Sequence, residues 1–333
     1  MRLWLGLVII VAAMVAGGCG VAAQSKTAPQ SAAAYAVWAR SDGGEPRIYA
    51  ASSLDPLPAA VSAKPAGQYL PTVSRDWIAW VDRSSGGSDI VLLDRRSGQT
   101  RVAARGVRDQ WFPAVSADWL LWARSTPTGS RVRALSLRSG ERLALDRPRP
   151  SMSAPRPRLS GSWVTWLQQG RRISTVWAYD LDARQLVRIA RGRCTAPAIA
   201  AGIIAYRDAV GIHCVDPASG DELRLVRLGK DSGVVGDPLM SEGQVLWATA
   251  SENGTVFDLW SCALATGEQR RLLTFDDMDP SMGLAVSGHS LVYVGTPDAG
   301  GSVPVCLVDL RSAHTEILAR QSGHLTGPAL IAE

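Results

Sequence analysis

Few residues in the chain have the type and spacing that chemistry requires. Gly288 to Ser290 match the first three positions of the Gly-x-Ser-x-Gly nucleophile elbow, but Val292 stands where the closing glycine belongs. The segment Asp276 to Asp279 could hold a cation through its carboxylates, yet it lacks the glycine and distal glutamate of a calcium loop. No metal-ligand spacing relates the four histidines, which are His213, His289, His314 and His324. The sequence therefore predicts no catalytic residue, no cofactor and no bound metal.

Cys19 has the most specific local context of the cysteines. Arg2 supplies a positive start, an apolar run extends from Leu3 to Val15, and Ala16 to Gly18 precede the cysteine. This order is typical of an export signal and is too short for a good membrane span. Its end resembles a bacterial lipobox, in which the cysteine is diacylated. We expect residues 1–18 to be a lipoprotein signal peptide, with cleavage by an ordinary signal peptidase as the alternative.

Lipid on Cys19 would anchor an exported protein to a membrane, facing the periplasm or the cell exterior. Residues 19–33 are rich in alanine, serine, glutamine and proline and hold almost no large apolar side chain. Such a segment cannot bury enough surface to fold, so we expect a flexible tether between the lipid and the folded domain.

Four further cysteines follow the tether, and export would permit them to form disulfides. They are Cys194, Cys214, Cys262 and Cys306. Three connectivities are open, and the sequence does not choose among them. Cys194 and Cys214 are closest in the chain and are the favoured pair. Cys262 and Cys306 fall at equivalent places in adjacent repeats, which suits buried thiols.

The charge balance allows an anionic partner. The net charge is +5, and almost all of the 35 basic residues are arginine, which binds phosphate and carboxylate groups through two parallel hydrogen bonds. This charge is too dilute over 333 residues to predict nucleic-acid binding. A candidate patch for anionic lipid head groups or wall polymer is formed by Arg147, Arg149, Arg156 and Arg158. The alternative is a solvated Arg-Pro loop.

From about residue 34 onward, a repeated unit organises the chain and positions the residues named above. The segment from Pro71 to Trp80 returns with starts at Pro113, Pro157, Pro197, Pro238 and Leu284. Each unit of about 42 residues holds a short apolar piece, an alternating run, a β-rich run and a glycine turn before a last strand. Four short strands per unit are typical of one propeller blade. We predict an all-β propeller over residues 34–333 with four-stranded antiparallel blades.

An aromatic residue occupies the same strand position in every unit. These residues are Trp38, Trp80, Trp122, Trp166, Tyr206, Trp247 and Tyr293. A ring of stacking platforms for sugars is one interpretation of the series. The fixed strand position favours the other interpretation, a packing layer between blades.

The chain ends predict how the ring closes. Pro328 to Ala332 fit the first strand of a unit that has no other strand, and the unit around Tyr35 to Trp38 lacks a good first strand. Pairing of the two ends would complete a seventh blade and remove exposed sheet edges. A six-bladed ring with the N-terminal unit appended outside is the alternative.

The repeat resembles that of the TolB-like propellers of bacterial and archaeal envelope proteins. Asp89 to Asp94, Trp177 to Leu181 and Leu264 to Thr274 carry the likeness, which covers about residues 35–332. The resemblance implies a fold and no single function. No separate α/β domain precedes the propeller, as one does in TolB, so we expect a TolB-like repeat protein and not TolB proper.

These observations predict a non-catalytic, monomeric envelope scaffold or sensor that binds a protein or an anionic polymer through its propeller loops. A hydrolase or lyase is one alternative, and it would need acid, base or metal-ligand side chains that converge on a central channel. A carbohydrate-binding module is another, and it would need loop aromatics, for which Tyr69 and Trp111 are the candidates.

Overall fold

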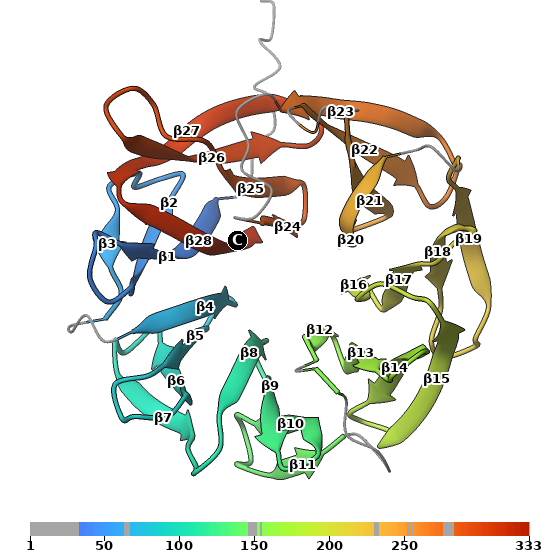
Figure 1. The fold of residues 1–333 in the computed structure, drawn as a ribbon, viewed down its shortest axis with the longest axis horizontal. Coiled ribbons are helices and arrows are strands. Elements are labelled where there is room, and N and C mark those ends of the chain that lie inside the picture. The colour runs from blue at the N-terminus through green and yellow to red at the C-terminus, as the bar shows by residue number, and fades with distance from the viewer. Residues whose placement is uncertain are drawn as a thin grey trace, which may run out of the picture. The chain divides into compact units, whose positions relative to one another are not determined.

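Seven four-stranded antiparallel sheets surround a common axis as the blades of a propeller (Figure 1). The computed structural model describes residues 33–62, 67–145, 152–153, 155–229, 233–251, 254, 256–275 and 283–332. These residues form strands and turns and no helix, so none of them provides a helix long and apolar enough to span a membrane. The predicted seven-bladed, all-β propeller is confirmed, and the six-bladed alternative is wrong.

Blade 1 combines both chain ends, and blades 2 to 7 follow in chain order. From the innermost strand outward, the strands of blades 1 to 3 are β28 (His324–Ala332), β1 (Ala34–Ser41), β2 (Arg47–Ser52) and β3 (Ala59–Ala60); β4 (Gln68–Val73), β5 (Trp77–Asp82), β6 (Asp89–Asp94) and β7 (Thr100–Ala104); and β8 (Gln110–Val115), β9 (Trp119–Thr126), β10 (Gly129–Ser136) and β11 (Arg142–Ala144).

The same order holds in the other blades. Blades 4 to 7 comprise β12 (Arg158–Ser160), β13 (Trp163–Gln169), β14 (Ser174–Asp180) and β15 (Gln185–Gly192); β16 (Ala198–Ala200), β17 (Ile203–Arg207), β18 (Gly211–Val215) and β19 (Glu222–Arg227); β20 (Val234–Ser241), β21 (Gln244–Ala250), β22 (Phe257–Ala263) and β23 (Gln269–Phe275); and β24 (Leu284–Ser287), β25 (Ser290–Val294), β26 (Ser302–Asp309) and β27 (His314–Ser322).

Ring closure occurs as predicted, by pairing of the two chain ends. β28 lies antiparallel to β1, with Ala332 opposite Ala34 at one end and His324 opposite Ser41 at the other. The strand is also anchored by its side chains, since Leu325 is 0% exposed and Leu330 is 8% exposed. Closure gives blade 1 the same four strands as the other blades and covers the inner edge of β1; propellers leave only short, protected edges in this way.

The repeated aromatic residues form the packing layer between blades. All seven are buried, and each belongs to a different hydrophobic cluster that joins its own blade to the preceding one. Trp38 joins blade 1 to blade 7, and its Nε1 donates a hydrogen bond of 2.8 Å to Gln321 Oε1. The packing interpretation of the series is therefore confirmed, and these rings are not available as sugar platforms.

Pro71, Pro113 and Pro238 lie at bulges in the innermost strands of their blades, whereas Pro157 and Pro197 lie just before theirs. In β4 and β8 the pairing ladder passes over two residues each, Leu70–Pro71 and Phe112–Pro113. Proline has no N–H to give to a ladder, so a bulge is a place where it can be accommodated. Leu70 and Phe112 take left-handed φ angles of 51° and 50°, which a bulge of this kind imposes on the residue before the proline.

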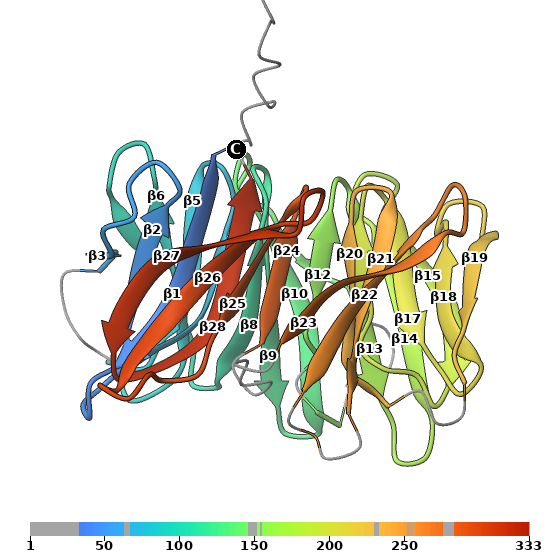
Figure 2. The same ribbon diagram turned by 90° about the horizontal axis from the view of Figure 1, so that it is seen from above.

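The links between blades and the start of β1 lie at opposite ends of the ring. A blade of four antiparallel strands returns the chain to the end where its innermost strand begins, so the links between blades lie at that end. We call it the connection end; Figure 2 shows the ring edge-on. β1 begins at the opposite end, because Ala34 pairs with Ala332, the last residue of β28.

Candidate functional site

Two of the predicted basic residues lie at the connection end of blade 4. Arg156 directly precedes the repeat proline Pro157, and its guanidinium carbon is 4.9 Å from the centroid of the Phe112 ring in blade 3. Arg158 begins β12, the innermost strand. These two arginines therefore lie beside the ring axis. The other two predicted residues, Arg147 and Arg149, lie outside the described residues.

Arg158 is exposed to solvent, yet its pKa is held below the ordinary value. Desolvation by the surrounding protein is the largest cause, and repulsion from Arg156 adds to it. Attraction to Asp237 of blade 6 acts in the opposite direction. The Arg158 side chain is thus exposed to solvent although the surrounding protein also desolvates it. A side chain that faces the ring axis fits both observations, because protein surrounds it while water still reaches it. Arginine stays charged at neutral pH in any case.

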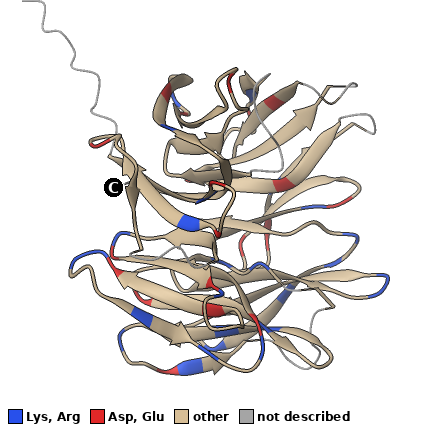
Figure 3. Cartoon of the chain, turned by 60° about the vertical axis from the view of Figure 1, so that its left-hand side comes forward, with Lys and Arg blue, Asp and Glu red and all other residues tan. Residues whose placement is uncertain are grey.

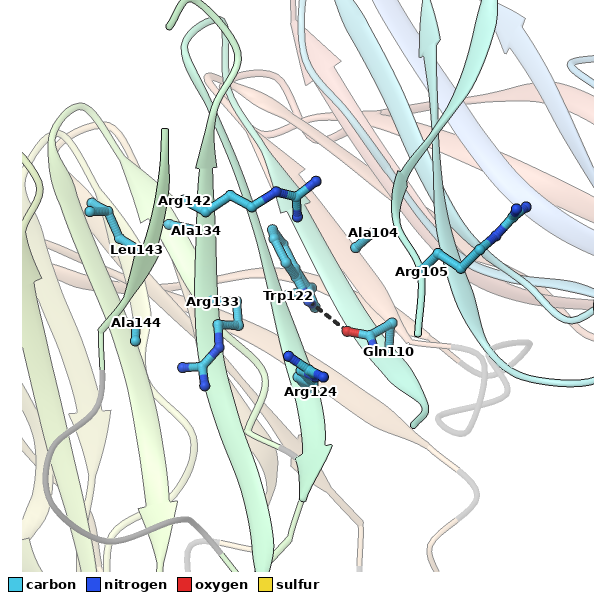
Figure 4. Close-up of a pocket in the computed structure, with 10 residues that line it drawn as sticks. All are labelled: Ala104, Arg105, Gln110, Trp122, Arg124, Arg133, Ala134, Arg142, Leu143 and Ala144. Atoms are coloured by element: carbon cyan, nitrogen blue, oxygen red, sulfur yellow. Dashed lines mark hydrogen bonds between the residues drawn. The ribbon is translucent and has the colours of Figure 1, made fainter. Parts of the chain in front are cut away.

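A second basic feature lies between blades 2 and 3 (Figure 4). It is a cavity of about 280 Å³, and we call it the arginine pocket. Its polar and aromatic lining comes from Arg105, Gln110, Trp122, Arg124, Arg133 and Arg142. Among the described residues that line it, none is acidic. Figure 3 shows that basic and acidic positions are otherwise interspersed on the side of the ring drawn there.

Sheet register gathers the pocket arginines on one face of blade 3. Gln110 lies opposite Arg124 in the β8–β9 pair, and Arg133 lies opposite Trp122 in the β9–β10 pair. Directly opposed residues in antiparallel strands share a face. Trp122 packs against blade 2. Arg124 and Arg133 therefore lie on the face of blade 3 that is directed toward blade 2. The sequence analysis missed these residues, because spacing alone does not reveal which strands pair in which register.

Hydrogen bonds hold part of the pocket wall in place. Trp122 Nε1 donates to Gln110 Oε1 at 2.7 Å, and Gln110 Nε2 donates to the Arg108 carbonyl at 2.5 Å. Arg142 donates to the Ala103 carbonyl of blade 2 at 2.8 Å and lies 5.9 Å over the Trp122 ring. Arg105 pairs with Asp89 at 3.1 Å, and Figure 4 shows its side chain directed away from Trp122.

Blade 5 contains a cluster of titratable side chains around His213. Its Nδ1 lies 2.5 Å from Glu222 Oε2, and its Nε2 lies 3.0 Å from Asp208 Oδ1. The imidazole stacks on Tyr206 with ring centroids 4.8 Å apart. Burial disfavours the charged imidazolium, but the hydrogen bonds to the two carboxylates and their charges outweigh it, so the pKa of His213 is raised. Within the described residues no group of His, Cys, Asp and Glu side chains is arranged to hold a metal.

The raised pKa of His213 predicts a pH-dependent stability. A group whose folded pKa is raised stabilises the fold below its unfolded pKa, about 6.5, and this contribution is lost as the pH rises through the folded pKa. The melting temperature of the wild type should therefore fall by about a few degrees between pH 6 and pH 8. His213→Gln should flatten that slope, whereas the exposed His314→Gln should leave it unchanged. Equal slopes in the wild type and His213→Gln, measured by scanning calorimetry, would contradict the assignment.

The four described cysteines carry free thiols in the structure. Cys214 is buried in the cluster between blades 5 and 6, whereas Cys194 packs in the cluster between blades 4 and 5. The two side chains thus pack on opposite faces of blade 5, and the structure does not support the expected disulfide between them. Burial raises the pKa of the Cys214 thiol to about 12.

The partial nucleophile motif forms no elbow. Gly288 lies in the turn between β24 and β25, and Ser290 is a buried residue at the start of β25. A nucleophile elbow instead leads from a strand into a helix and exposes its serine. Asp276 to Asp279 and Cys19 lie outside the described residues.

Comparison with known proteins shows likeness in fold. No protein-family model and no curated protein matches the sequence. TolB from Acinetobacter baumannii is 12% identical, with a TM-score of 0.57 over 90% of this chain and 66% of that chain. An oligogalacturonate lyase in complex with manganese is 11% identical, with a TM-score of 0.58 over 85% of this chain and 83% of that chain. A puromycin-hydrolysing peptidase of Mycobacterium tuberculosis is 14% identical, with a TM-score of 0.61 over 85% of this chain and 52% of that chain.

At these identities the likeness establishes the propeller fold and no activity. The chain spans just under two thirds of the length of the A. baumannii TolB and about half of the peptidase.

Proposed function

We propose that this propeller is a non-catalytic scaffold or sensor of the cell envelope that binds an anionic polymer at its connection end. The protein would be exported and held to a membrane by lipid on Cys19. The observation that carries the proposal is the pair Arg156 and Arg158, two exposed cations beside the ring axis, of which Arg158 is repelled by Arg156 and attracted by the carboxylate of Asp237.

The contacts of this pair suit it to binding. Arg156 lies over the Phe112 ring and has no hydrogen-bond or ion-pair partner among the described residues, so its N–H groups can meet a carboxylate or phosphate. Asp237 is also engaged by the backbone, since its Oδ1 accepts a hydrogen bond of 3.0 Å from Ala196 N. The attraction of Arg158 to one carboxylate does not neutralise both arginines, so an incoming anion would gain from each of them.

The position of the N-terminal strand supports the proposed arrangement. β1 begins at the end of the ring opposite the connection end. A tether that reaches the ring at Ala34 would attach to the far end, so the connection end with Arg156 and Arg158 would be open to a polymer in the envelope.

Polymer binding can be measured with immobilised polygalacturonate as the acidic polymer and dextran as its uncharged counterpart. The double variant Arg156→Gln/Arg158→Gln should bind the acidic polymer at least about fivefold more weakly, because two charge-assisted contacts are lost. Added salt should weaken the wild type in the same direction. Arg138→Gln/Arg184→Gln removes the same charge from residues already paired with Asp118 and Glu141, and it should bind like the wild type.

Equal binding by the wild type and the Arg156→Gln/Arg158→Gln variant would reject the connection end as the site. Capture of envelope proteins in place of polymer would redirect the proposal to a protein partner. The anchor is checked in the same cells with radiolabelled fatty acid, which should enter the wild type and not Cys19→Ala; labelling of both would reject lipidation at Cys19.

A further inference from the structure

We propose that the loop between β2 and β3, residues 53–58, is a membrane-contact loop that places Leu54 and Leu57 in the interface of a phospholipid bilayer. The inference deepens the proposed function and rests on its anchor, because lipid on Cys19 is what brings this loop to a membrane. It does not rest on the arginine pair at the connection end, which lies at the other end of the ring.

Two large apolar side chains of this loop are almost entirely in solvent. Leu54 is 82% exposed and Leu57 is 76% exposed. Prolines at positions 56 and 58 flank Leu57 and restrict the backbone on both sides of it. A single exposed leucine is ordinary on a soluble protein, but two of them in one short, proline-restricted loop form an apolar tip that gains by leaving water.

The membrane-contact loop departs from the repeat. In every other blade the turn between the third and fourth strands has a polar tip, and among the described residues of these six turns no large apolar side chain is exposed. The six turns are residues 95–99, 137–141, 181–184, 216–221, 264–268 and 310–313. The apolar tip is therefore a property of blade 1 alone and is not required by the blade architecture.

Sheet register and hydrogen bonds place this loop where the chain enters the ring. Ser52, the last residue of β2, lies opposite Tyr35 near the start of β1. Ser53 N donates to Ala34 O at 2.9 Å, and Ala34 N donates to Ser53 Oγ at 3.0 Å. We call this end of the ring the tether end; the C-terminus of β28 marks it in Figure 2. The loop with the exposed leucines is thus bonded directly to the residue at which the N-terminal segment joins the fold.

The loop also satisfies part of its own backbone. Ser52 N donates to Asp55 O at 3.0 Å, and Asp55 N donates to Ser52 O at 3.1 Å. Leu57 N donates to Asp55 Oδ1 at 3.4 Å. Backbone groups that are already bonded within the protein cost less to move out of water than unpaired ones. These bonds therefore make the loop suited to the interfacial region of a bilayer.

The length of the N-terminal segment keeps the tether end near the lipid. Residues 20–33 separate Cys19 from Ala34, and a flexible chain of that length has an end-to-end distance of about 20 Å. Anchoring at this distance gives the loop a high effective concentration at the bilayer, so two leucines can suffice for contact. Because the contact is apolar, it requires no anionic lipid and should persist at high salt.

The experiment uses the protein as isolated from membranes, with its lipid anchor, in phosphatidylcholine vesicles that contain a lipid with a photoreactive diazirine in its acyl chain. After illumination, labelled peptides are identified by mass spectrometry. We expect acyl label within residues 53–58, unchanged by added salt. The internal control is Val107, which is 100% exposed in the link between blades 2 and 3 at the connection end, and its peptide should stay unlabelled.

Two variants decide whether the leucines make the contact. Leu54→Ser/Leu57→Ser should lower the label in the loop at least about fivefold, without a change in melting temperature, because both side chains are already in solvent. Leu54→Ile/Leu57→Ile should keep the label. The inference is overturned if anchored wild type carries no acyl label in the loop, if the Val107 peptide is labelled as strongly, or if the serine variant is labelled like the wild type. Cross-linking of the loop to protein in place of lipid would also overturn it, in favour of a protein interface.

Failure of this inference is distinguishable from failure of the proposed function. Incorporation of radiolabelled fatty acid reports the anchor, and polygalacturonate binding reports the arginine pair, which Leu54→Ser/Leu57→Ser should leave unchanged. An anchored protein without acyl label in the loop overturns the inference alone. A wild type without fatty acid removes the anchor and overturns the inference together with that part of the proposed function.

Discussion

Ending the chain at Gly323 should abolish the cooperative unfolding of the ring. This change deletes β28, the innermost strand of blade 1, and leaves β1 paired with β2 alone. Burial of Leu325 and Leu330 contributes about 1.5–3 kcal/mol each. Each lost backbone hydrogen bond adds about 0.5–1.5 kcal/mol. The total is comparable with the whole stability of a typical domain, about 5–15 kcal/mol.

The measurement is thermal unfolding followed by circular dichroism. A chain that ends at Ile331 keeps nearly all of β28 and should melt within a few degrees of the full chain. If the chain that ends at Gly323 still unfolds cooperatively at the temperature of the full chain, the closing strand does not stabilise the ring and the account of the fold fails.

Trp38→Ala should destabilise the protein by about 3–5 kcal/mol, as large-to-small changes of buried tryptophan do. The indole is 0% exposed and lies in the cluster that joins blade 1 to blade 7. Its loss opens a cavity at the seam where the ring closes. It also leaves buried Gln321 without the Nε1 hydrogen bond, which adds a desolvation cost of about 1–3 kcal/mol.

Urea unfolding monitored by circular dichroism tests this expectation. Val107→Ala provides the reference, because Val107 is fully exposed and its truncation should change stability by no more than about 0.5 kcal/mol. A loss below about 1 kcal/mol for Trp38→Ala would show that the aromatic layer does not hold the blades together.

Much of the fold follows from the repeat. Because the period is near that of one blade, the strand count per blade and the packing role of the aromatics could be predicted from spacing alone. Closure could be predicted from composition: the segment before Tyr35 is too polar for a strand, while Pro328 to Ala332 is apolar and has no following strand. The number of blades stayed open at that stage, because it depends on whether those two ends meet.

The binding residues were less accessible to the sequence. Arg156 and Arg158 were predicted to act together, but proximity in the chain did not reveal that the repeat proline between them places both beside the axis. Arg124 and Arg133 were missed because only strand register puts them on one face. The expected pairing of Cys194 with Cys214 fails for the same reason, since neighbours in sequence can face opposite sides of a blade.

The central claim is that the two ends of the chain complete one blade, and a designed cross-link tests it most directly. Ser41 and His324 are directly opposed in the β1–β28 pair, where Cα atoms lie about 4.5–5.5 Å apart, within the range that a disulfide spans. Under mild oxidation, Ser41→Cys/His324→Cys should give one intramolecular link joining peptides from the two chain ends, found by mass spectrometry in the monomer fraction. The pair Ser41→Cys/His314→Cys, which places the second cysteine on the outermost strand of blade 7, should not form such a link. Absence of the first link in folded protein, or its formation only between separate molecules, would contradict the closed ring.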